Sequence, residues 1–470
     1  MTVLKNSSAP SGVVVREGRY GERIAAVEPG GVGFIPHTER HGRPLQLLWT
    51  WTSPNLEFTT VFLGVLAVAA FGLGFWQAVA AIVLGTGLGA IAHGVLSAGG
   101  PGHGVPQMVL GRVPFGFRGN ILPASFNTVA GGIGWFAVNS VSATFALNTL
   151  TGLPKPLCLA IVVGAQVVIA FFGHNLVHAF ERYAFPVLAV VFGVVTVIIL
   201  SKAELGAPGA ANGGGLGGFL IALAASFGYA AGWNPYAADY TRYLPVDTDR
   251  RAVGLFAGLG VFVGCTLLQI VGAASATIGG KALEDPTGAF TGHLPPLIGD
   301  LTLLAITLGA VSANAVNIYS GSMSFVTLGI RLPLPSAVQR AMVALIFGAV
   351  GLVVAYFGLD DAGHGYEAFL LIIGYWIGPW LGVVLVDLYL RRKKPIDHLL
   401  FDPLHRNWAG PIAMAAGVVL SVWLFSNQEK YVGVIPERFT SIGDVTFEVG
   451  FLISAGLYLA LRPLRHTEQA

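Results

Sequence analysis

Long apolar runs recur along the whole chain and are separated by short polar or glycine- and proline-rich segments. Runs of roughly 18–25 apolar residues are long enough to cross about 30 Å of hydrocarbon as a helix. The pattern therefore predicts an all-α polytopic membrane protein with about twelve transmembrane helices. The predicted spans are approximately 46–71, 74–98, 122–150, 156–173, 184–201, 218–240, 252–279, 297–326, 336–358, 366–390, 408–426 and 446–462.

The composition agrees with a membrane protein and excludes several other classes. Hydrophobic residues make up 54% of the chain and charged residues 11%, whereas a soluble domain carries about 25% charge. A net charge of +2 gives no support for nucleic-acid binding. Hydrolase, kinase and dinucleotide motifs do not occur in a suitable strand and helix context, so we expect neither an enzyme nor a resident cofactor. Cys158 and Cys265 lie in apolar runs and are expected to be free thiols.

The distribution of basic residues predicts the orientation of the chain in the cell membrane. With alternating loops and both termini in the cytoplasm, 21 of the 26 Lys and Arg residues fall on the cytoplasmic side. The run 391–394 is then a basic anchor for this topology. Residues 1–44 are polar and lack the apolar core of a cleavable signal peptide, so we expect them to form a flexible cytoplasmic arm. Residues 464–470 form the second cytoplasmic tail.

Two of the apolar runs are interrupted by residues that disfavour a membrane helix. The sixth run contains Gly-Trp-Asn-Pro-Tyr-Ala-Ala-Asp-Tyr-Thr-Arg-Tyr-Leu-Pro over 232–245, and the first contains Trp-Thr-Trp-Thr-Ser-Pro-Asn-Leu-Glu over 49–57. Pro235 has no N–H and crowds the carbonyl of Ala231, which then needs a ligand, an ion or water as its partner at membrane depth. If the repeat unit is five helices, Pro54 marks the matching break, and the two breaks face each other around a binding site. The alternative is that each proline only kinks its helix.

Two further runs carry polar side chains at helical spacing. Trp135 and Asn139 are four residues apart in the third run, which places an aromatic plane and an amide on one helix face. Asn314 and Asn317 are three apart in the eighth run, and they can offer donors and acceptors to a planar polar ligand. The alternatives are close helix packing at the glycines before Trp135 and hydrogen bonding between helices at the two amides.

These motifs together resemble the nucleobase-cation symporter family, in its purine-cytosine permease branch. The segments that resemble this family are 232–243, the Gly-Trp of the third run, the Asn-Ile-Tyr-Ser of the eighth run, 104–109 and 178–183. The resemblance implies a LeuT-like core of two inverted five-helix repeats with broken helices one and six, followed by two extra helices. The implied transmembrane domain covers 45–463, with repeat one at about 45–202, repeat two at about 218–392 and the extra helices at about 407–463.

The resemblance also implies that a nucleobase is held between the aromatic rings of Trp135 and Trp233, next to Gly232. Stacking of a base on an aromatic ring is worth roughly 1–3 kcal/mol and tolerates any heterocycle. Hydrogen bonds must therefore select the base, and we expect them from Asn139, from the two amides of the eighth run and from Glu57.

Glu57 is the residue that departs most from the family pattern, because relatives often carry an amide at this place. An ionisable residue inside the membrane is functional by default. It can donate as a protonated acid, accept as a carboxylate or carry a proton for coupling. A fourth alternative is purely structural, in which the carboxyl pairs with a backbone N–H at the helix break.

The coupling cation is expected to be H⁺ or Na⁺. Sodium-coupled relatives use carbonyls of broken helix one and adjacent hydroxyls of helix eight, which correspond here to Ser53, Leu56 and Ser312. Val311 lacks one of those hydroxyls, which weakens a sodium site of five oxygens. For this reason, and because of Glu57, protons are favoured over sodium.

Two groups of ionisable residues lie near predicted cytoplasmic ends of helices, outside the predicted substrate site. His174, His178 and Glu181 have a spacing that can place metal ligands on one helix face, but packing at the membrane interface is favoured and no metal is predicted. Asp239 and Arg242 are three apart, and they can form an intracellular gating pair or a simple surface pair.

The sequence therefore predicts a symporter that imports a nucleobase such as cytosine or a purine by alternating access. The alternatives are a transporter of a related heterocycle (hydantoin, allantoin or a vitamin), an uncoupled facilitator or channel, and a sensor that binds without transport. The expected partners are the small-molecule substrate and the lipid bilayer, and the sequence does not determine the oligomeric state.

Overall fold

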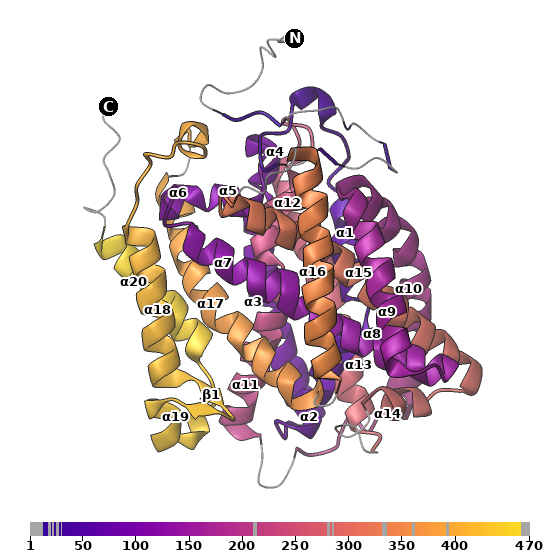
Figure 1. Ribbon diagram of the computed structural model, residues 1–470. Coiled ribbons are helices and arrows are strands. Elements are labelled where there is room, and N and C mark those ends of the chain that lie inside the picture. Colours follow the sequence, from indigo (N-terminus) through magenta and orange to yellow (C-terminus); the bar gives the residue numbers. More distant parts are fainter. Residues whose placement is uncertain are drawn as a thin grey trace.

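The computed structural model is a bundle of long helices (Figure 1). It describes residues 13–16, 20, 23–24, 28–29, 31–209, 214–279, 283, 286–330, 336–359, 362–391 and 394–461. About 77% of the structure is helical. The helices in chain order are α1 Gln46–Thr52, α2 Phe58–Ala69, α3 Phe75–Ser97, α4 Gly100–His103, α5 Gln107–Leu110, α6 Arg112–Phe115, α7 Ile121–Val129, α8 Phe136–Thr151, α9 Lys155–Phe172, α10 His174–Lys202, α11 Gly215–Ala231, α12 Ala237–Thr241, α13 Arg250–Ala276, α14 Pro286–Gly292, α15 Pro296–Thr327, α16 Ser336–Gly358, α17 Ala362–Arg391, α18 Ala409–Phe425, α19 Val434–Arg438 and α20 Thr446–Ala460.

Shorter elements mark turns and interruptions between these helices. The 3-10 turns are η1 His37–Glu39, η2 Ser53–Asn55, η4 Asn234–Tyr236, η5 Asp397–Leu399 and η6 Thr440–Ile442. A π-helical turn, η3 Ala130–Trp135, joins α7 to α8. The strands β1 Asn427–Gln428 and β2 Tyr431–Val432 form a small antiparallel hairpin between α18 and α19.

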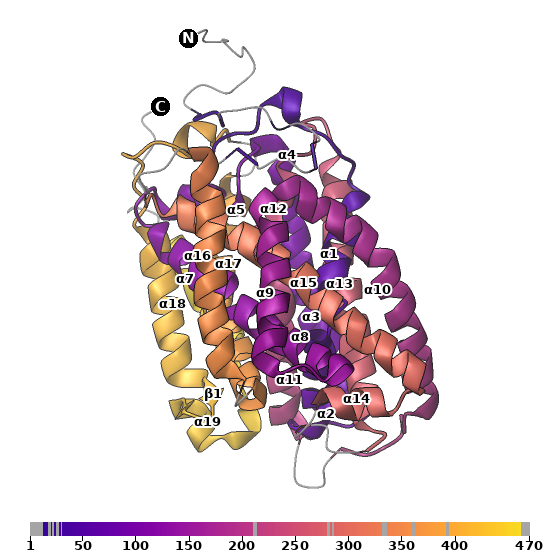
Figure 2. The same cartoon turned by 45° about the vertical axis from the view of Figure 1, so that its right-hand side comes forward.

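The helices of the described residues agree with a multi-pass membrane protein. Eight are long and apolar enough to cross a membrane, and four shorter apolar helices lie among them. Each predicted span falls on one of these helices, while twelve crossings remain a prediction. The boundary predicted at 184 is wrong, because α10 begins at His174 and continues through Pro186. The last helices, α18 to α20, lie together at one edge of the bundle, against α17 (Figures 1 and 2).

The described part of the N-terminal segment is packed against the helices and is not the free arm that its composition suggests. Phe34 and Ile35 are buried, and the N–H of Ile35 donates to the carbonyl of Gly104 at 2.9 Å. Val15 and Phe34 form an isolated bridge. This segment covers the end of the bundle where α4 and α12 lie, which we call the α12 end (Figure 1). Residues 1–12 and 462–470 lie outside the described residues, as do Arg392 and Lys393 of the basic run.

Glycines allow the two sides of the core to approach closely. A Cβ atom added at Gly272 of α13 would lie 1.8 Å from the carbonyl oxygen of Val61 in α2, and one added at Gly64 would lie 1.7 Å from that of Gln269. Any side chain at these positions must push the two helices apart. The α2–α13 contact therefore depends on glycine, as is common between membrane helices.

We expect Gly272→Ala to lower the thermal stability of the purified protein in detergent. Overpacking of this kind costs roughly 1–3 kcal/mol because the backbone must shift. Gly193→Ala in α10 is the matched control, since no atom beyond the adjacent residues and backbone of its own helix lies within 4 Å of a Cβ built there. In the control, alanine should be neutral or slightly stabilising, because it favours a helix by about 1 kcal/mol over glycine. Equal melting temperatures for the two variants would contradict the prediction.

Candidate functional site

The two broken helices meet in the interior of the bundle. The break between α1 and α2 contains Asn55, and the break between α11 and α12 contains Trp233. The indole Nε1–H of Trp233 donates to Oδ1 of Asn55 at 2.9 Å, and Nδ2 of Asn55 donates to the carbonyl of Trp51 at 2.7 Å. Both side chains are buried. The breaks predicted from Pro54 and Pro235 are therefore in direct contact.

A π-helical turn places Trp135 opposite this junction. The turn η3 inserts an extra residue into the helical ladder just before α8, and such turns are frequent at functional sites. Its glycines permit close packing, since a Cβ at Gly132 would lie 3.3 Å from Cα of Gly321 in α15. The expected close packing at these glycines is thus present, while the role of Trp135 in binding substrate stays a prediction.

A small cavity lies between these elements. Both indoles beside it are about 7% exposed, so the site is nearly closed. Its lining consists of Trp135, Asn139, Tyr229, Gly232, Trp233 and Asn317. Five of these residues were predicted from the sequence. Among the predicted substrate residues, Glu57 and Asn314 do not line it.

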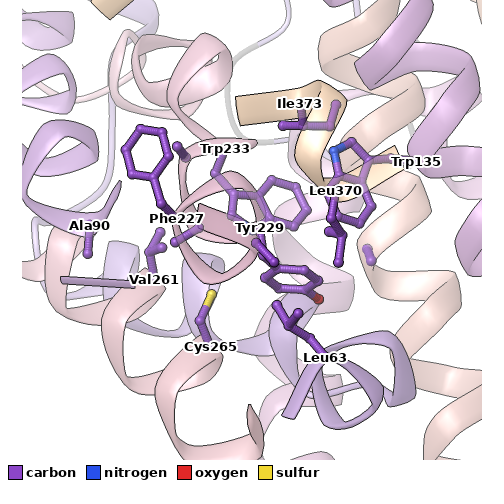
Figure 3. Close-up of a cluster of buried hydrophobic side chains, with 14 of the residues drawn as sticks. Leu63, Ala90, Trp135, Phe227, Tyr229, Trp233, Val261, Cys265, Leu370 and Ile373 are labelled. Atoms are coloured by element: carbon purple, nitrogen blue, oxygen red, sulfur yellow. The ribbon is translucent and has the colours of Figure 1, made fainter. Parts of the chain in front are cut away.

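Tyr229 is the lining residue that the sequence analysis missed. It precedes Trp233 by one helical turn, which is the spacing that places two side chains on one face. Its ring meets that of Trp135 edge to face, with centroids 5.2 Å apart and an interplanar angle of 88°. Phe369 packs against Trp135 in the same way at 5.0 Å. Figure 3 shows Tyr229, Trp135 and Trp233 together in the core. The orientation of the Trp135 indole is therefore set by its aromatic neighbours.

Gly232 contributes to the cavity through the space that its missing side chain leaves. A Cβ at this position would lie 3.1 Å from Nε1 of Trp135 and 3.2 Å from the carbonyl oxygen of Tyr229. A larger residue would therefore intrude between the indole edge and the backbone of the helix break.

Three asparagines form a hydrogen-bonded network beside the cavity. Oδ1 of Asn314 accepts from Nδ2 of Asn139 at 3.1 Å and from Nδ2 of Asn317 at 3.3 Å. Asn314 in turn donates to the carbonyl of Phe136 at 2.8 Å and to Ser140 at 3.1 Å. Interhelical hydrogen bonding, one of the alternatives for these amides, is thus present for Asn314. Asn139 and Asn317 also face the cavity.

Glu57 caps the second half of the broken first helix. Its Oε2 accepts from the N–H of Thr59 at 2.9 Å, and its Oε1 accepts from the hydroxyl of Tyr229 at 2.8 Å. The carboxyl is fully buried behind Tyr229. The backbone contact at the helix break is the structural role considered for Glu57. The carboxyl is also linked to the cavity through Tyr229, one of its lining residues.

Two of the predicted cation ligands approach each other. The hydroxyls of Ser53 and Ser312 are 3.3 Å apart, and that of Ser312 donates to Oε2 of Glu181 at 2.6 Å. The other oxygen of Glu181 has no hydrogen-bond partner among the described residues, although the side chain is fully buried. The carbonyl oxygen of Leu56 faces α15, 2.3 Å from a Cβ built at Gly309. Glu181 is therefore an interior carboxyl at the predicted cation site, and the expectation that it lies in an interfacial surface is wrong.

The histidines that precede Glu181 make separate contacts. Nδ1 of His178 lies 3.1 Å from the hydroxyl of Thr50, and the ring of His174 stacks on Tyr243 with centroids 4.1 Å apart. Together with His41 and Tyr240, they line a second cavity near the α12 end.

Arg242 and Asp239 are both buried, so the alternative of a simple surface pair is wrong. Arg242 forms an ion pair with Glu28 of the N-terminal segment at 3.0 Å. The same carboxylate accepts from the hydroxyl of Tyr243 at 2.5 Å and from the N–H of His174 at 3.1 Å. Asp239 instead accepts from the N–H of Gln107 at 2.9 Å. The ionic contact that ties the described N-terminal segment to the broken helix is thus Glu28–Arg242.

A helical membrane bundle with a nearly closed cavity between two interrupted helices has the architecture of a secondary transporter. The chain matches, over residues 34–450, the family described as permeases for cytosine/purines, uracil, thiamine and allantoin. It belongs to this family, the purine-cytosine permease branch of the nucleobase-cation symporters.

Individual relatives match over nearly the whole chain. YxlA of Bacillus subtilis is 29% identical over 457 residues, covering 94% of this chain and 98% of its own length. The purine-cytosine permease fcyB of Emericella nidulans is 26% identical over 464 residues, covering 94% of this chain and 90% of its own length.

Solved structures share the fold. Mhp1, a nucleobase-cation-symport-1 family transporter solved in a closed conformation with bromovinylhydantoin bound, superposes with a TM-score of 0.73 at 19% identity, covering 91% of this chain and 93% of that one. Its inward-facing conformation superposes with a TM-score of 0.68, also at 19% identity, and covers 96% and 97%. This chain therefore shares the fold of Mhp1, while the five-plus-five inverted repeat stays a prediction.

Proposed function

We propose that the protein imports a nucleobase such as cytosine or a purine across the cell membrane, together with a cation, by alternating access. The observation that carries this proposal is the cavity between Trp135 and Trp233 at the junction of the two broken helices. A flat heterocycle stacks on the indoles and loses most of its contact with water. The names of the relatives support a nucleobase as the heterocycle.

The binding energy of substrate and cation together drives the conformational cycle. Both bind at elements that belong to different parts of the bundle, because Ser53 lies at one break, Trp233 at the other, and Ser312 on α15. Each ligand shifts the equilibrium only by its differential affinity for the two states. Closure around both ligands therefore couples the uphill movement of the base to the downhill movement of the cation. The proposal has both termini in the cytoplasm, on the grounds of the distribution of basic residues.

The proton is the favoured cation, on the grounds of Glu57 and of the hydroxyl missing at Val311. Sodium is the second candidate, and one observation supports it. Glu181 brings a carboxylate oxygen to Ser53 and Ser312, which offsets the hydroxyl that Val311 lacks. Proton coupling and sodium coupling predict opposite responses of uptake to the two ion gradients.

Uptake of radiolabelled cytosine and adenine into proteoliposomes tests the proposal. We expect accumulation driven by an inward proton gradient, abolished by an uncoupler and unaffected by a sodium gradient at constant pH. Accumulation that follows the sodium gradient and ignores the uncoupler would select sodium. Equilibration without accumulation would select an uncoupled facilitator, and binding without flux would select a sensor.

Competition by unlabelled heterocycles identifies the substrate class in the same assay. Transporters of related heterocycles are the alternative, supported by the hydantoin bound to Mhp1 and by the allantoin and thiamine in the family description. We expect cytosine or a purine to compete at lower concentrations than hydantoin, allantoin or thiamine. If hydantoin, allantoin or thiamine competes at the lowest concentration, that compound and not a nucleobase is the substrate class.

A further inference from the structure

The cavity exposes few polar groups that are not already engaged. Among its lining side chains, Trp233 donates to Asn55, Tyr229 donates to Glu57, and Asn139 bonds Asn314 and Thr59. Oδ1 of Asn317 is buried and has no hydrogen-bond partner among the described residues. An unpaired amide oxygen in a closed site is costly unless a ligand satisfies it.

The hydrogen-bond network determines which end of the Asn317 amide faces the cavity. The two ends of an amide differ only in donating or accepting, so the partners of each end decide its orientation. The carbonyl of Phe136 can only accept, and it lies 2.8 Å from the amide of Asn314. The NH₂ group of Asn314 must therefore point toward Phe136, and its oxygen must point the other way, toward Asn139 and Asn317.

The oxygen of Asn314 then orients both neighbours. It requires an NH₂ group from each of Asn139 and Asn317, at 3.1 and 3.3 Å. The opposite end of Asn139 is an oxygen, which the hydroxyl of Thr59 satisfies at 3.2 Å. The opposite end of Asn317 is also an oxygen, and it is left for a ligand.

From this chain of contacts we infer that Asn314 is a positioning residue that holds the carbonyl oxygen of Asn317 toward the cavity, so that the site selects heterocycles presenting an N–H donor there. The inference rests on the proposed function and adds the residue that determines selectivity. Asn314 itself does not touch the ligand. A heterocycle with an acceptor or a blocked nitrogen at that edge is rejected, because it leaves the amide oxygen unpaired or repelled.

Equilibrium binding to the purified protein tests this inference without depending on transport. The probe is radiolabelled cytosine or adenine, whichever binds, displaced by matched pairs of competitors. Cytosine and uracil, and likewise adenine and hypoxanthine, have nearly the same shape but exchange donors and acceptors along one edge. Cytosine and 1-methylcytosine differ by one blocked N–H.

For at least one of these pairs we expect the two inhibition constants measured with the wild type to differ by at least about tenfold, as for a site with a buried unpaired acceptor. In Asn314→Leu the amide of Asn317 is free to turn, so this ratio of inhibition constants should fall by at least about fivefold toward one. Asn127→Leu is the matched control. Asn127 is also a buried amide that bonds α15, through Ser324 at 2.7 Å, and it does not line the cavity. Its ratio should equal that of the wild type.

Asn314→Ala provides a smaller variant in case Asn314→Leu does not fold. It also removes the amide that bonds the Phe136 carbonyl and the amide of Asn317, so the ratio should fall in the same direction. An unchanged ratio in folded Asn314→Leu, or in Asn314→Ala if only that variant folds, would overturn the inference alone. Absence of binding for every heterocycle in the wild type would overturn the proposed function, and the inference with it.

Discussion

Replacing either cavity tryptophan by alanine should raise the half-saturating substrate concentration at least about tenfold. In the proposed site Trp135 and Trp233 each offer an aromatic face to the ligand, and stacking on one face is worth roughly 1–3 kcal/mol. A loss of about 1.4 kcal/mol corresponds to a factor of ten in affinity. The measurement is the concentration dependence of labelled nucleobase uptake, normalised to the amount of protein at the cell surface. Trp135→Phe should recover part of the affinity, because phenylalanine retains a smaller aromatic face.

The control for this prediction is a tryptophan that lies far from the cavity. Trp423 in α18 is about 53% exposed, and Trp423→Ala should leave the half-saturating concentration unchanged. Unaltered uptake in both Trp135→Ala and Trp233→Ala, at equal surface expression, is the result that would remove the cavity from consideration as the substrate site.

The sequence predicted the core of the cavity because its residues are unusual in their surroundings. An asparagine, or a proline beside a tryptophan, is rare in a run that must lie in lipid, so Asn139, Asn317 and the two breaks stood out. Tyr229 did not stand out, since an aromatic residue in an apolar run is usually core. Only the fold, which brings its hydroxyl to Glu57, distinguishes it.

Other roles depended on contacts between residues that are distant in the chain. The sequence spacing does not distinguish Asn314 from Asn317. Asn314 lies behind the cavity because its amide donates to Phe136 and Ser140, whereas Asn317 faces the cavity. Glu181 was read with its neighbouring histidines, since the sequence shows i and i+4 relations only within one helix. Its actual partner is 131 residues away.

Glu28 could not be predicted from the sequence, because it does not stand out from its surroundings. It lies in a polar segment, where a carboxylate is unremarkable, and nothing in the local pattern shows that it is buried against the broken sixth helix. The sequence suggests a gating role for Arg242, which stays a prediction, and the nearest partner visible in the sequence is Asp239, three residues away on the same helix. The fold supplies a closer ion pair from a segment 214 residues away.

Neutralising Glu28 should open the α12 end of the protein. Its carboxylate is fully buried and holds Arg242, Tyr243 and the N–H of His174 together. Removing one partner of a buried ion pair costs about 3–5 kcal/mol, because the other charge is left uncompensated. In Glu28→Gln this cost falls on the state shown here and not on a state in which the segment has moved away. The population should therefore shift toward the state that is open at this end.

The shift can be read from a cysteine placed at Leu47, which lines the second cavity and is only 3% exposed. Glu28→Gln should raise the rate at which an impermeant thiol reagent modifies Leu47→Cys by at least about tenfold, when applied from the α12 side of oriented vesicles. Glu39→Gln is the matched control, because Glu39 pairs with Arg16 in the same segment and not with a helix of the bundle. The double exchange Glu28→Arg with Arg242→Glu should slow the modification again, since it restores the pair with reversed polarity. Equal rates in wild-type, Glu28→Gln and Glu39→Gln backgrounds would show that the N-terminal segment does not close the bundle. They would leave the stacking site and its predictions unaffected, because no residue of this ion pair lines the cavity between the indoles.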